Sequence, residues 1–131
     1  FADMVSKSAN YCAATSASPT AVLLLCDVAL GEQYERITAE FEAASRSKKA
    51  GKHSTWGVGK TAPEEKGSTR LDGIKVPMGR GVPSEHMSTH LERLKAAEAG
   101  AQPALLYNEY IVYDVNQVRM CYVVICDLEF V

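Results

Sequence analysis

Residues 105–114 read LLYNEYIVYD, a stretch with the composition of a β-strand and one acid in its middle. Because side chains alternate between the two faces of a strand, Tyr107, Glu109, Ile111 and Tyr113 share one face, and Asn108, Tyr110, Val112 and Asp114 share the other. An unpaired carboxylate among aromatic and aliphatic side chains is costly to desolvate. The strand alone therefore leaves two interpretations open for Glu109, a carboxylate kept for chemistry or a hydrogen-bonded structural acid.

Length and composition limit the chain to one domain of ordinary globular character. It has 131 residues, of which 47% are hydrophobic and 23% charged, and its net charge of -2 provides no general attraction to nucleic acid or anionic membranes. No apolar run is long enough to cross a bilayer, and the N-terminus lacks a signal-peptide pattern. The four cysteines form no CxxC pair, so we expect reduced thiols in a reducing, intracellular compartment and neither a zinc site nor a disulfide framework.

The first half of the chain predicts one helix, two strands and a variable region. A short helix is expected over Asp3–Tyr11, with Asp3 as its N-cap. The apolar run in Thr20–Leu30 predicts a strand buried on both faces, and a second extended stretch is expected over Gln33–Ile37. Thr38–Lys52 has the composition of either a short exposed helix or a loop.

The second half predicts turns, a helix and a final hairpin. Glycine and proline in residues 51–83 favour turns and short strands. Residues 82–102 form a helical pattern with Met87, Leu91 and Leu94 on one face, ended by Gly100 and Pro103. Two strands, residues 105–114 and 118–130, are expected to form an antiparallel hairpin. The fold class is therefore α+β.

Three local patterns are candidates for binding. Ser8 and Tyr11 are three residues apart on the predicted helix, with Lys7 beside them, so a ring and a hydroxyl could hold a planar amide. Packing of Tyr11 into the core is the favoured alternative. His86 and His90 have a metal-compatible spacing, but the intervening glutamate of a zinc-protease motif is missing, and solvated histidines with no metal site are expected.

The glycine-rich segment at residues 57–61, GVGKT, has part of the composition of a phosphate-binding loop. Ser54 stands where that motif requires its first glycine, and no strand or helix is predicted in the required places around it. We therefore expect a glycine-rich connection and not a nucleoside triphosphate site.

Several segments together resemble one family. Residues 1–12, FADMVSKSANYC, are similar to the nicotinamide-pocket helix of poly(ADP-ribose) polymerases, and residues 105–114 are similar to the strand that carries their catalytic glutamate. Segments 28–31, 51–54, 57–61, 71–73 and 76–79 resemble others that recur in the same order. The resemblance runs nearly end to end and is closest to the DNA-damage-responsive branch. It implies the strand-rich half of the ADP-ribosyltransferase fold, with split antiparallel sheets around an NAD cleft.

The resemblance also implies roles for individual residues. Glu109 resembles the catalytic glutamate, and Lys7 a lysine at the edge of the nicotinamide pocket that we count as catalytic. Ser8 and Tyr11 resemble the residues that hold nicotinamide, and Tyr107 lies where the acceptor approaches the donor ribose. The residues expected to bind NAD are Phe1, Ala2, Ser8, Tyr11 and Tyr107.

The family's donor site also uses a histidine and a glycine on an early strand and a tyrosine before the segment matching Phe1, which have no counterpart in this chain. We therefore expect residues 1–131 to be the C-terminal part of a catalytic domain, with a helical insertion at 84–104. The parent domain would transfer ADP-ribose from NAD to acceptor proteins, with the other half supplied in cis or trans. DNA would be contacted only through other domains, the location would be the nucleus, and no membrane partner is expected.

This chain alone is predicted to be inactive. The alternative is a catalytically inactive half-domain retained as a structural or interaction module in a larger assembly.

Overall fold

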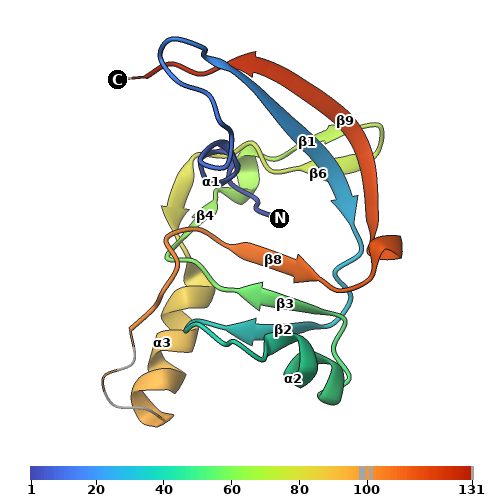
Figure 1. Ribbon diagram of the computed structural model, residues 1–131. Helices are drawn as coiled ribbons and strands as arrows, with labels where there is room; N and C mark the ends of the chain where they lie inside the picture. Colours follow the sequence, from blue (N-terminus) through green and yellow to red (C-terminus); the bar gives the residue numbers. More distant parts are fainter. Residues whose placement is uncertain (98–99, 101, 131) are drawn as a thin grey trace.

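The computed structural model describes residues 1–97, 100 and 102–130, and it is of the α+β class. Figure 1 shows a long two-stranded ribbon above a three-stranded sheet, with short strand pairs and the first helix between them. The ribbon pairs β1 (Thr20–Val28) with β9 (Val118–Asp127). The sheet has the order β2–β3–β8, where β2 is Gln33–Arg36, β3 is Ser54–Gly57 and β8 is Glu109–Val112.

The three-stranded sheet is mixed, which refines the expectation of antiparallel sheets. β2 and β3 are parallel, whereas β3 and β8 are antiparallel, with Trp56 opposite Tyr110 and Gly57 opposite Glu109. Its central strand β3 is one of the short strands expected in residues 51–83. Trp56 on this strand is buried in the core, as suits a large aromatic side chain on a central strand.

Two short antiparallel pairs account for the other four strands. β4 (Thr61–Pro63) pairs with β7 (Gly81–Pro83), and β5 (Thr69–Leu71) pairs with β6 (Ile74–Val76). Asp72 and Gly73 connect β5 and β6 with φ angles of 49° and 81°, the left-handed conformation that a tight two-residue hairpin turn requires. The Tyr122 hydroxyl of β9 is hydrogen-bonded to the Asp72 carboxylate, which ties this hairpin to the ribbon.

The core lies between the sheet and α3 (Glu85–Ala97). It consists of buried Ile37, Trp56, Val58 and Met87, against which Leu91, Leu94 and Tyr110 pack. The predicted helical spacing of Met87, Leu91 and Leu94 is thus confirmed. The helix is shorter than residues 82–102: Ser84 Oγ accepts a hydrogen bond from the Met87 N–H at 3.2 Å, which fixes its start. Residues 98, 99 and 101, beside the predicted stop signal Gly100, lie outside the described residues.

The remaining helices are short. α1 spans Val5–Ala9 and α2 spans Ala43–Lys49, so the structure selects the helix from the two alternatives for residues 38–52. Single 3-10 turns lie at Glu65–Gly67 and Val115–Gln117. No helix among the described residues is long and apolar enough to cross a membrane.

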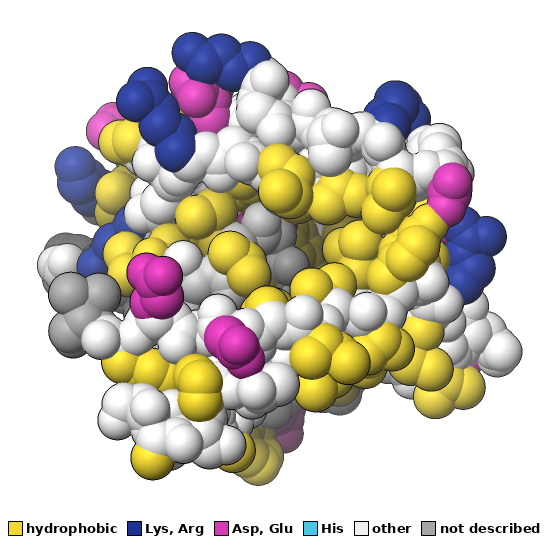
Figure 2. All heavy atoms as spheres, turned by 90° about the horizontal axis from the view of Figure 1, so that it is seen from above, with side chains coloured by type: hydrophobic (Ala, Val, Ile, Leu, Met, Phe, Trp, Pro, Cys, Tyr) yellow, Lys and Arg dark blue, Asp and Glu magenta, His cyan; other side chains and the backbone are white. Residues whose placement is uncertain are grey.

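The prediction that the first strand is buried on both faces is wrong. Of the residues in β1 and β9, all of which are described, only Ala21 is buried. The side chains that alternate outward are exposed by 56–70%: Val22, Leu24, Met120, Val123 and Ile125. Figure 2, which views the molecule from the ribbon side, shows hydrophobic side chains spread across this surface. The apolar run therefore predicted the strand correctly, but it did not predict that the outer face of the strand is exposed.

The predicted hairpin between the last two strands is also wrong, because β8 pairs with β3 and β9 pairs with β1. The connection explains the separation. Asp114 and Gln117 form a capping box around the Val115–Gln117 turn, which ends β8 and redirects the chain. Gln117 Nε2 then donates to the carbonyls of Ala29 and His53, anchoring the turn between the two sheets.

Candidate active site

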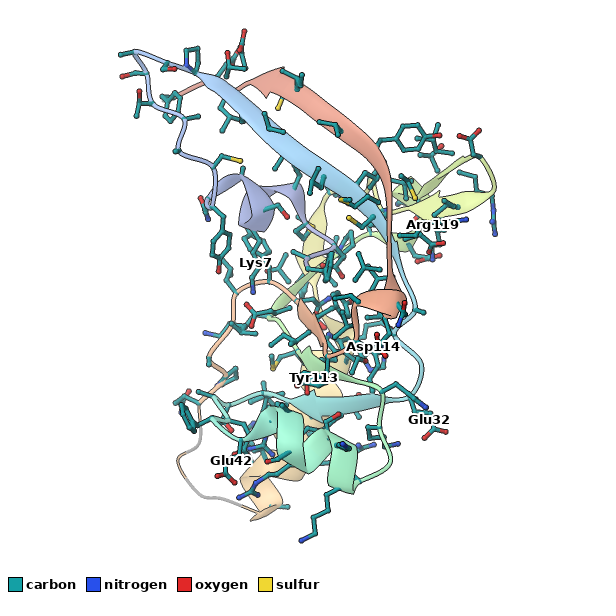
Figure 3. All side chains as sticks on the ribbon, turned by 45° about the vertical axis from the view of Figure 1, so that its right-hand side comes forward. Lys7, Glu32, Glu42, Tyr113, Asp114 and Arg119 are labelled. Carbon is teal, nitrogen blue, oxygen red and sulfur yellow. The ribbon has the colours of Figure 1, made fainter. Side chains whose placement is uncertain are left out.

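Glu109, the first residue of β8, forms an ion pair with Lys7 of α1. The distance from Lys7 Nζ to Glu109 Oε2 is 2.8 Å, and the two side chains are 13% and 33% exposed. Figure 3 shows Lys7 on α1 above the segment that leads into β8. The expectation of an acid buried in an apolar face is therefore wrong, because Ile111 and Tyr113 on the same face are also exposed. The pair brings the two segments that carry the family resemblance into contact.

The buried face of this strand is the opposite one, and it holds a polar network centred on Asn108. Asn108 is 3% exposed, and its Oδ1 accepts hydrogen bonds from Trp56 Nε1 at 3.1 Å and from the Gly59 N–H at 2.9 Å. Its Nδ2 donates to Asp3 Oδ2 at 2.8 Å. Asn108 thus links the central strand, the segment after it and the N-terminal segment, and holds the backbone next to Glu109.

Asp3 belongs to this network and is not the N-cap of α1, which corrects the prediction. The N-cap position is Met4, whose side chain forms no capping bond, and Asp3 Oδ2 instead accepts from both Asn108 and the Tyr110 hydroxyl, the latter at 2.9 Å. Sequence reasoning missed this role because a polar residue before a helix is a cap signal by itself, whereas its partners are more than a hundred residues away. Nothing in the sequence indicated that Asn108 would bind both Asp3 and Trp56.

Tyr110 is held in its neutral form. Burial, followed by the negative charge of Asp3 and the hydrogen bond to it, raises the pKa of Tyr110 well above its usual value of 10.0. A neutral phenol can donate to Asp3, so the raised pKa and the observed hydrogen bond agree. The other carboxylate oxygen of Asp3, Oδ1, is buried and has no hydrogen-bond partner among the described residues.

Phe1 extends the sheet beside β8. Its backbone nitrogen donates to the Tyr110 carbonyl at 2.8 Å, and the Tyr110 N–H donates to the Phe1 carbonyl at 2.9 Å. This two-way exchange is that of an antiparallel hydrogen-bonded pair. The N-terminal segment is thereby fixed to the strand that carries Glu109, through the backbone at Phe1 and the side chain at Asp3.

Ser8 and Tyr11 lie differently from the prediction. α1 ends at Ala9, so Tyr11 lies beyond it in a turn closed by a 3.1 Å hydrogen bond from the Tyr11 N–H to the Ser8 carbonyl. The Tyr11 side chain is 81% exposed, so its packing into the core, the favoured alternative, is wrong. An exposed ring leaves a face free for stacking.

A cavity of about 790 Å³ lies between the inner side of the ribbon and the β5–β6 hairpin. Its walls are largely apolar, and Phe1, Ala2, Asp3 and Ser8 form one end of it. Lys7, Glu109, Tyr11 and Tyr107 are not among its lining residues. The cavity therefore adjoins the N-terminal segment of the candidate site without containing its ion pair.

The glycine-rich segment at residues 57–61 is a packing element. Val58 is fully buried, and a Cβ on Gly59 would lie 2.2 Å from the Tyr107 carbonyl carbon, so only glycine permits this approach to β8. β3 precedes the segment, contrary to expectation, but β4 and not a helix follows it. Tyr107 is partly buried and forms an isolated bridge with Thr61.

Of the two histidines of α3, His86 is exposed, as predicted, whereas His90 is largely covered, which corrects the prediction for His90. The His90 side chain is only 13% exposed, and its Nε2 lies 2.5 Å from Glu35 Oε2 while its Nδ1 lies 2.8 Å from the His86 carbonyl. The His86 ring packs edge-on against Trp56 at 4.7 Å. Among the described residues no cluster of three metal-ligating side chains is present. Both histidines hold α3 against the sheet.

Comparisons with known proteins agree with this geometry. The family described as poly(ADP-ribose) polymerase catalytic domain matches residues 1–128. Poly(ADP-ribose) polymerase 1 of Gallus gallus is 47% identical over 124 residues, covering 93% of this chain and 10% of that protein. Poly(ADP-ribose) polymerase 2-A of Oryza sativa subsp. japonica is 45% identical over 131 residues, covering 99% of this chain and 17% of that protein.

A more distant animal relative, poly(ADP-ribose) polymerase of Drosophila melanogaster, is 41% identical over 123 residues, covering 93% of this chain and 11% of that protein. The chain thus spans less than a fifth of the length of each of these curated relatives. The match covers both α1 and β8, the two elements that the Lys7–Glu109 ion pair joins. The chain belongs to the poly(ADP-ribose) polymerase catalytic domain family.

Proposed function

We propose that the chain supplies the nicotinamide-pocket helix and the catalytic glutamate of a domain that transfers ADP-ribose from NAD to acceptor proteins. The observation that carries the proposal is the ion pair between Lys7 and Glu109, which places α1 against the start of β8. Family membership supports the reaction class. NAD is the donor substrate in this proposal.

The chemistry fits the residue types at this position. Cleavage of the bond between nicotinamide and ribose builds positive charge on the sugar, as in glycoside hydrolysis. A carboxylate beside the ribose stabilises that charge and orients the acceptor. Glu109 is suited to this role because Lys7 and the Asn108 network hold it in place while a third of its side chain stays open to a ligand.

The other proposed roles belong mainly to residues of the N-terminal segment. The exposed ring of Tyr11 would stack on nicotinamide and the Ser8 hydroxyl would bind its amide, with Phe1 and Ala2 in the adjoining wall. Tyr107, two residues before Glu109, would lie where the acceptor approaches. These residues form one wall of the proposed donor site.

The other wall would come from the preceding half of the catalytic domain, in cis or in trans, so we propose that this chain alone is inactive. Residues 84–104 would be an insertion into the family fold. The same proposal places the parent protein in the nucleus, with DNA reached only through other domains.

A second function, that of an inactive module in a larger assembly, is favoured by one observation. The outer face of the ribbon is apolar and exposed, and such surfaces often bind another protein.

The deciding experiment joins this chain to the preceding half of its catalytic domain and measures transfer of labelled ADP-ribose from NAD to protein. Glu109→Gln should lower the rate about 10²–10³-fold, the loss typical for one transition-state-stabilising group. Glu42→Gln, at an exposed acid that precedes α2, is the matched control and should leave the rate unchanged.

An unchanged rate in Glu109→Gln would refute the catalytic role. Labelling by the isolated chain would refute the inactivity proposed for it. If the joined domain transfers nothing although it is folded, the module is the correct interpretation.

A further inference from the structure

Two of the four cysteines meet at an irregularity in the ribbon. Leu25 of β1 is opposite Tyr122 of β9, but the next residue, Cys26, is opposite Met120, so Cys121 is an extra residue in β9. In a β-bulge of this kind two residues of one strand oppose one residue of the other. Cys26 therefore faces both Met120 and Cys121 across the ribbon.

The spacing at this point suits a covalent link. Paired strands lie about 4.8 Å apart, and disulfides join residues whose Cα atoms are about 4.4–6.8 Å apart. From this strand spacing we expect the Cα atoms of Cys26 and Cys121 to lie within the range that a disulfide can join.

Both cysteines also belong to the wall of one cavity. Cys26 and Cys121 are among the residues that line the 790 Å³ cavity, and both are half-buried. Burial raises the pKa of Cys26, and the nearby negative charge of a Cys121 thiolate raises it further. This electrostatic contribution agrees with the register of the bulge, which makes the two cysteines neighbours across the ribbon. All four cysteines are free thiols in the structure.

We propose that Cys26 and Cys121 form a dithiol that hydroperoxides oxidise to a disulfide. The thiolate of one cysteine attacks a peroxide oxygen and breaks the O–O bond, giving a sulfenic acid and water. The second thiol loses its proton and attacks that sulfur, which forms the S–S bond and releases a second water. The two thiols lose two electrons, and hydrogen peroxide is reduced to two molecules of water.

The other two cysteines are not placed to form this pair. Cys126 is opposite Ala21, at the far end of the ribbon from the bulge, and Cys12 Sγ lies 3.6 Å from the Val22 carbonyl oxygen.

Because only the thiolate attacks, the raised pKa of Cys26 predicts that disulfide formation is faster at alkaline pH. The proposal does not depend on ADP-ribosyl transfer, since it rests on the ribbon alone.

The physical consequence would be a covalent link between β1 and β9, the strands whose outer side chains are exposed. The disulfide would close the chain from Cys26 to Cys121 and prevent β1 and β9 from separating at the bulge. The ribbon is one wall of the cavity, so oxidation would hold the two strands of that wall together at the bulge.

The test treats the full chain, reduced and folded, with hydrogen peroxide, blocks free thiols by alkylation and maps the peptides under non-reducing conditions. The peptides of Cys26 and Cys121 should be linked in one major product. Local effective concentrations within a chain are of the order of millimolar, so at about 10 µM protein this link should exceed links between chains roughly a hundredfold.

Substitutions make the assignment specific. Cys26→Ser and Cys121→Ser should each abolish the link and leave a sulfenic acid, trapped by dimedone, on the remaining partner. Cys12→Ser and Cys126→Ser are the matched controls and should leave its yield unchanged. A link formed equally among all four cysteines, or with equal selectivity in urea, would overturn the proposal.

A second measurement does not depend on the variants folding. Phenylarsine oxide binds two neighbouring thiols at once and releases one water, so the unaltered chain should bind one arsenical across Cys26 and Cys121. Dithiothreitol should remove it, whereas a monothiol at the same concentration should not. No bound arsenical, or one attached at other cysteines, would show that the two thiols are not neighbours.

Discussion

The sheet β2–β3–β8 and the ribbon β1–β9 are both built of regularly paired strands, yet only the sheet has a core of its own. α3 covers the sheet and buries Trp56 and Met87, whereas the ribbon buries Ala21 alone and exposes its outward side chains. Backbone pairing is therefore enough to form a strand, but a second layer is needed to exclude water from its side chains.

The same difference explains where the candidate site lies. Glu109 belongs to the covered sheet, whose Asn108 network fixes its backbone, and Lys7 belongs to α1, beneath the ribbon. A carboxylate that must be held accurately is thus on the rigid side, and the segment proposed to hold the ligand is on the open side. This contrast predicts that substitutions in the sheet cost more than equivalent substitutions in the ribbon.

The largest effect is expected for Trp56→Ala. Trp56 is 9% exposed and donates to Asn108, so its removal leaves a cavity and takes away one of the two hydrogen bonds to Asn108 Oδ1, with an expected loss of about 3–5 kcal/mol in the free energy of unfolding. Ile125→Ala in the ribbon, at a side chain 70% exposed, should change it by no more than about 0.5 kcal/mol. Urea unfolding followed by circular dichroism measures both.

Similar losses for these two variants would contradict the contrast, because they would mean that the ribbon's outer face is buried in solution. Trp56→Phe separates the two contributions. It keeps most of the apolar volume and removes the hydrogen bond to Asn108, so it should cost about 1–3 kcal/mol.

The next largest effect is expected for Gly59→Ala. The new Cβ would meet the backbone of Tyr107 and Asn108 at 2.2–2.4 Å, which forces β8 away from the segment that supports it. We expect a loss of about 1–3 kcal/mol in the free energy of unfolding, typical of overpacking. Gly57→Ala is the control, because its Cβ would meet the end of the Leu105 side chain, which can rotate, and otherwise makes ordinary contacts of 3.5–3.6 Å with Glu109. Equal losses in thermal unfolding would refute the backbone clash.

Gly59 also illustrates what the sequence could not reveal. Its segment was correctly separated from phosphate-binding loops by the position of Ser54, but its actual role depends on an approach to β8 across about fifty residues. The helical pattern of α3 was predictable, because three apolar side chains at helical spacing report a local geometry. Local periodicity identifies elements, whereas their partners are decided by packing at a distance.

The final hairpin and the cap at Asp3 failed for the same reason. Neighbouring strands in sequence usually pair, and a polar residue before a helix usually caps it, but β8 and β9 each have a better partner elsewhere and Asp3 binds Asn108. The family resemblance predicted that Lys7 and Glu109 belong to one site, but it did not predict their ion pair. Its geometry, and the network behind it, required the structure.

A smaller effect is expected at alkaline pH, where the titration of Tyr110 in the sheet lowers the free energy of unfolding. The pKa of Tyr110 is raised in the folded chain, so its contribution to stability is fully present below the unfolded pKa of about 10 and is lost as the pH rises further. Tyr110→Phe should therefore make the decline of unfolding free energy above about pH 10 shallower. Asp3→Asn should do so as well, because it removes the negative charge that helps to raise this pKa.

Tyr11→Phe controls for the loss of a phenol at an exposed position, since its side chain lies on the open side. Chemical unfolding at a series of pH values measures the slope in each variant. A slope that is the same for Tyr110→Phe and Tyr11→Phe would show that Tyr110 titrates as an ordinary surface phenol.

The smallest effects are expected for two ion pairs, one at the site and one in the ribbon. Arg119 Nη2 lies 2.9 Å from Asp27 Oδ2, but these side chains are 67% and 47% exposed, so Arg119→Met should change the free energy of unfolding by less than about 0.5 kcal/mol. Lys7→Met breaks a better covered pair and should cost up to about 1 kcal/mol.

Salt distinguishes the two ion pairs further, because mobile ions screen exposed charges more than partly buried ones. The Arg119 contribution, measured in a double-mutant cycle with Asp27→Asn, should vanish in about 1 M salt, where the screening length is roughly 3 Å. The Lys7 contribution, measured in a cycle with Glu109→Gln, should persist in part, since Lys7 is largely covered. Equal loss of both would mean that Glu109 is held by the Asn108 backbone network alone, and that Lys7 serves the proposed ligand more than the fold.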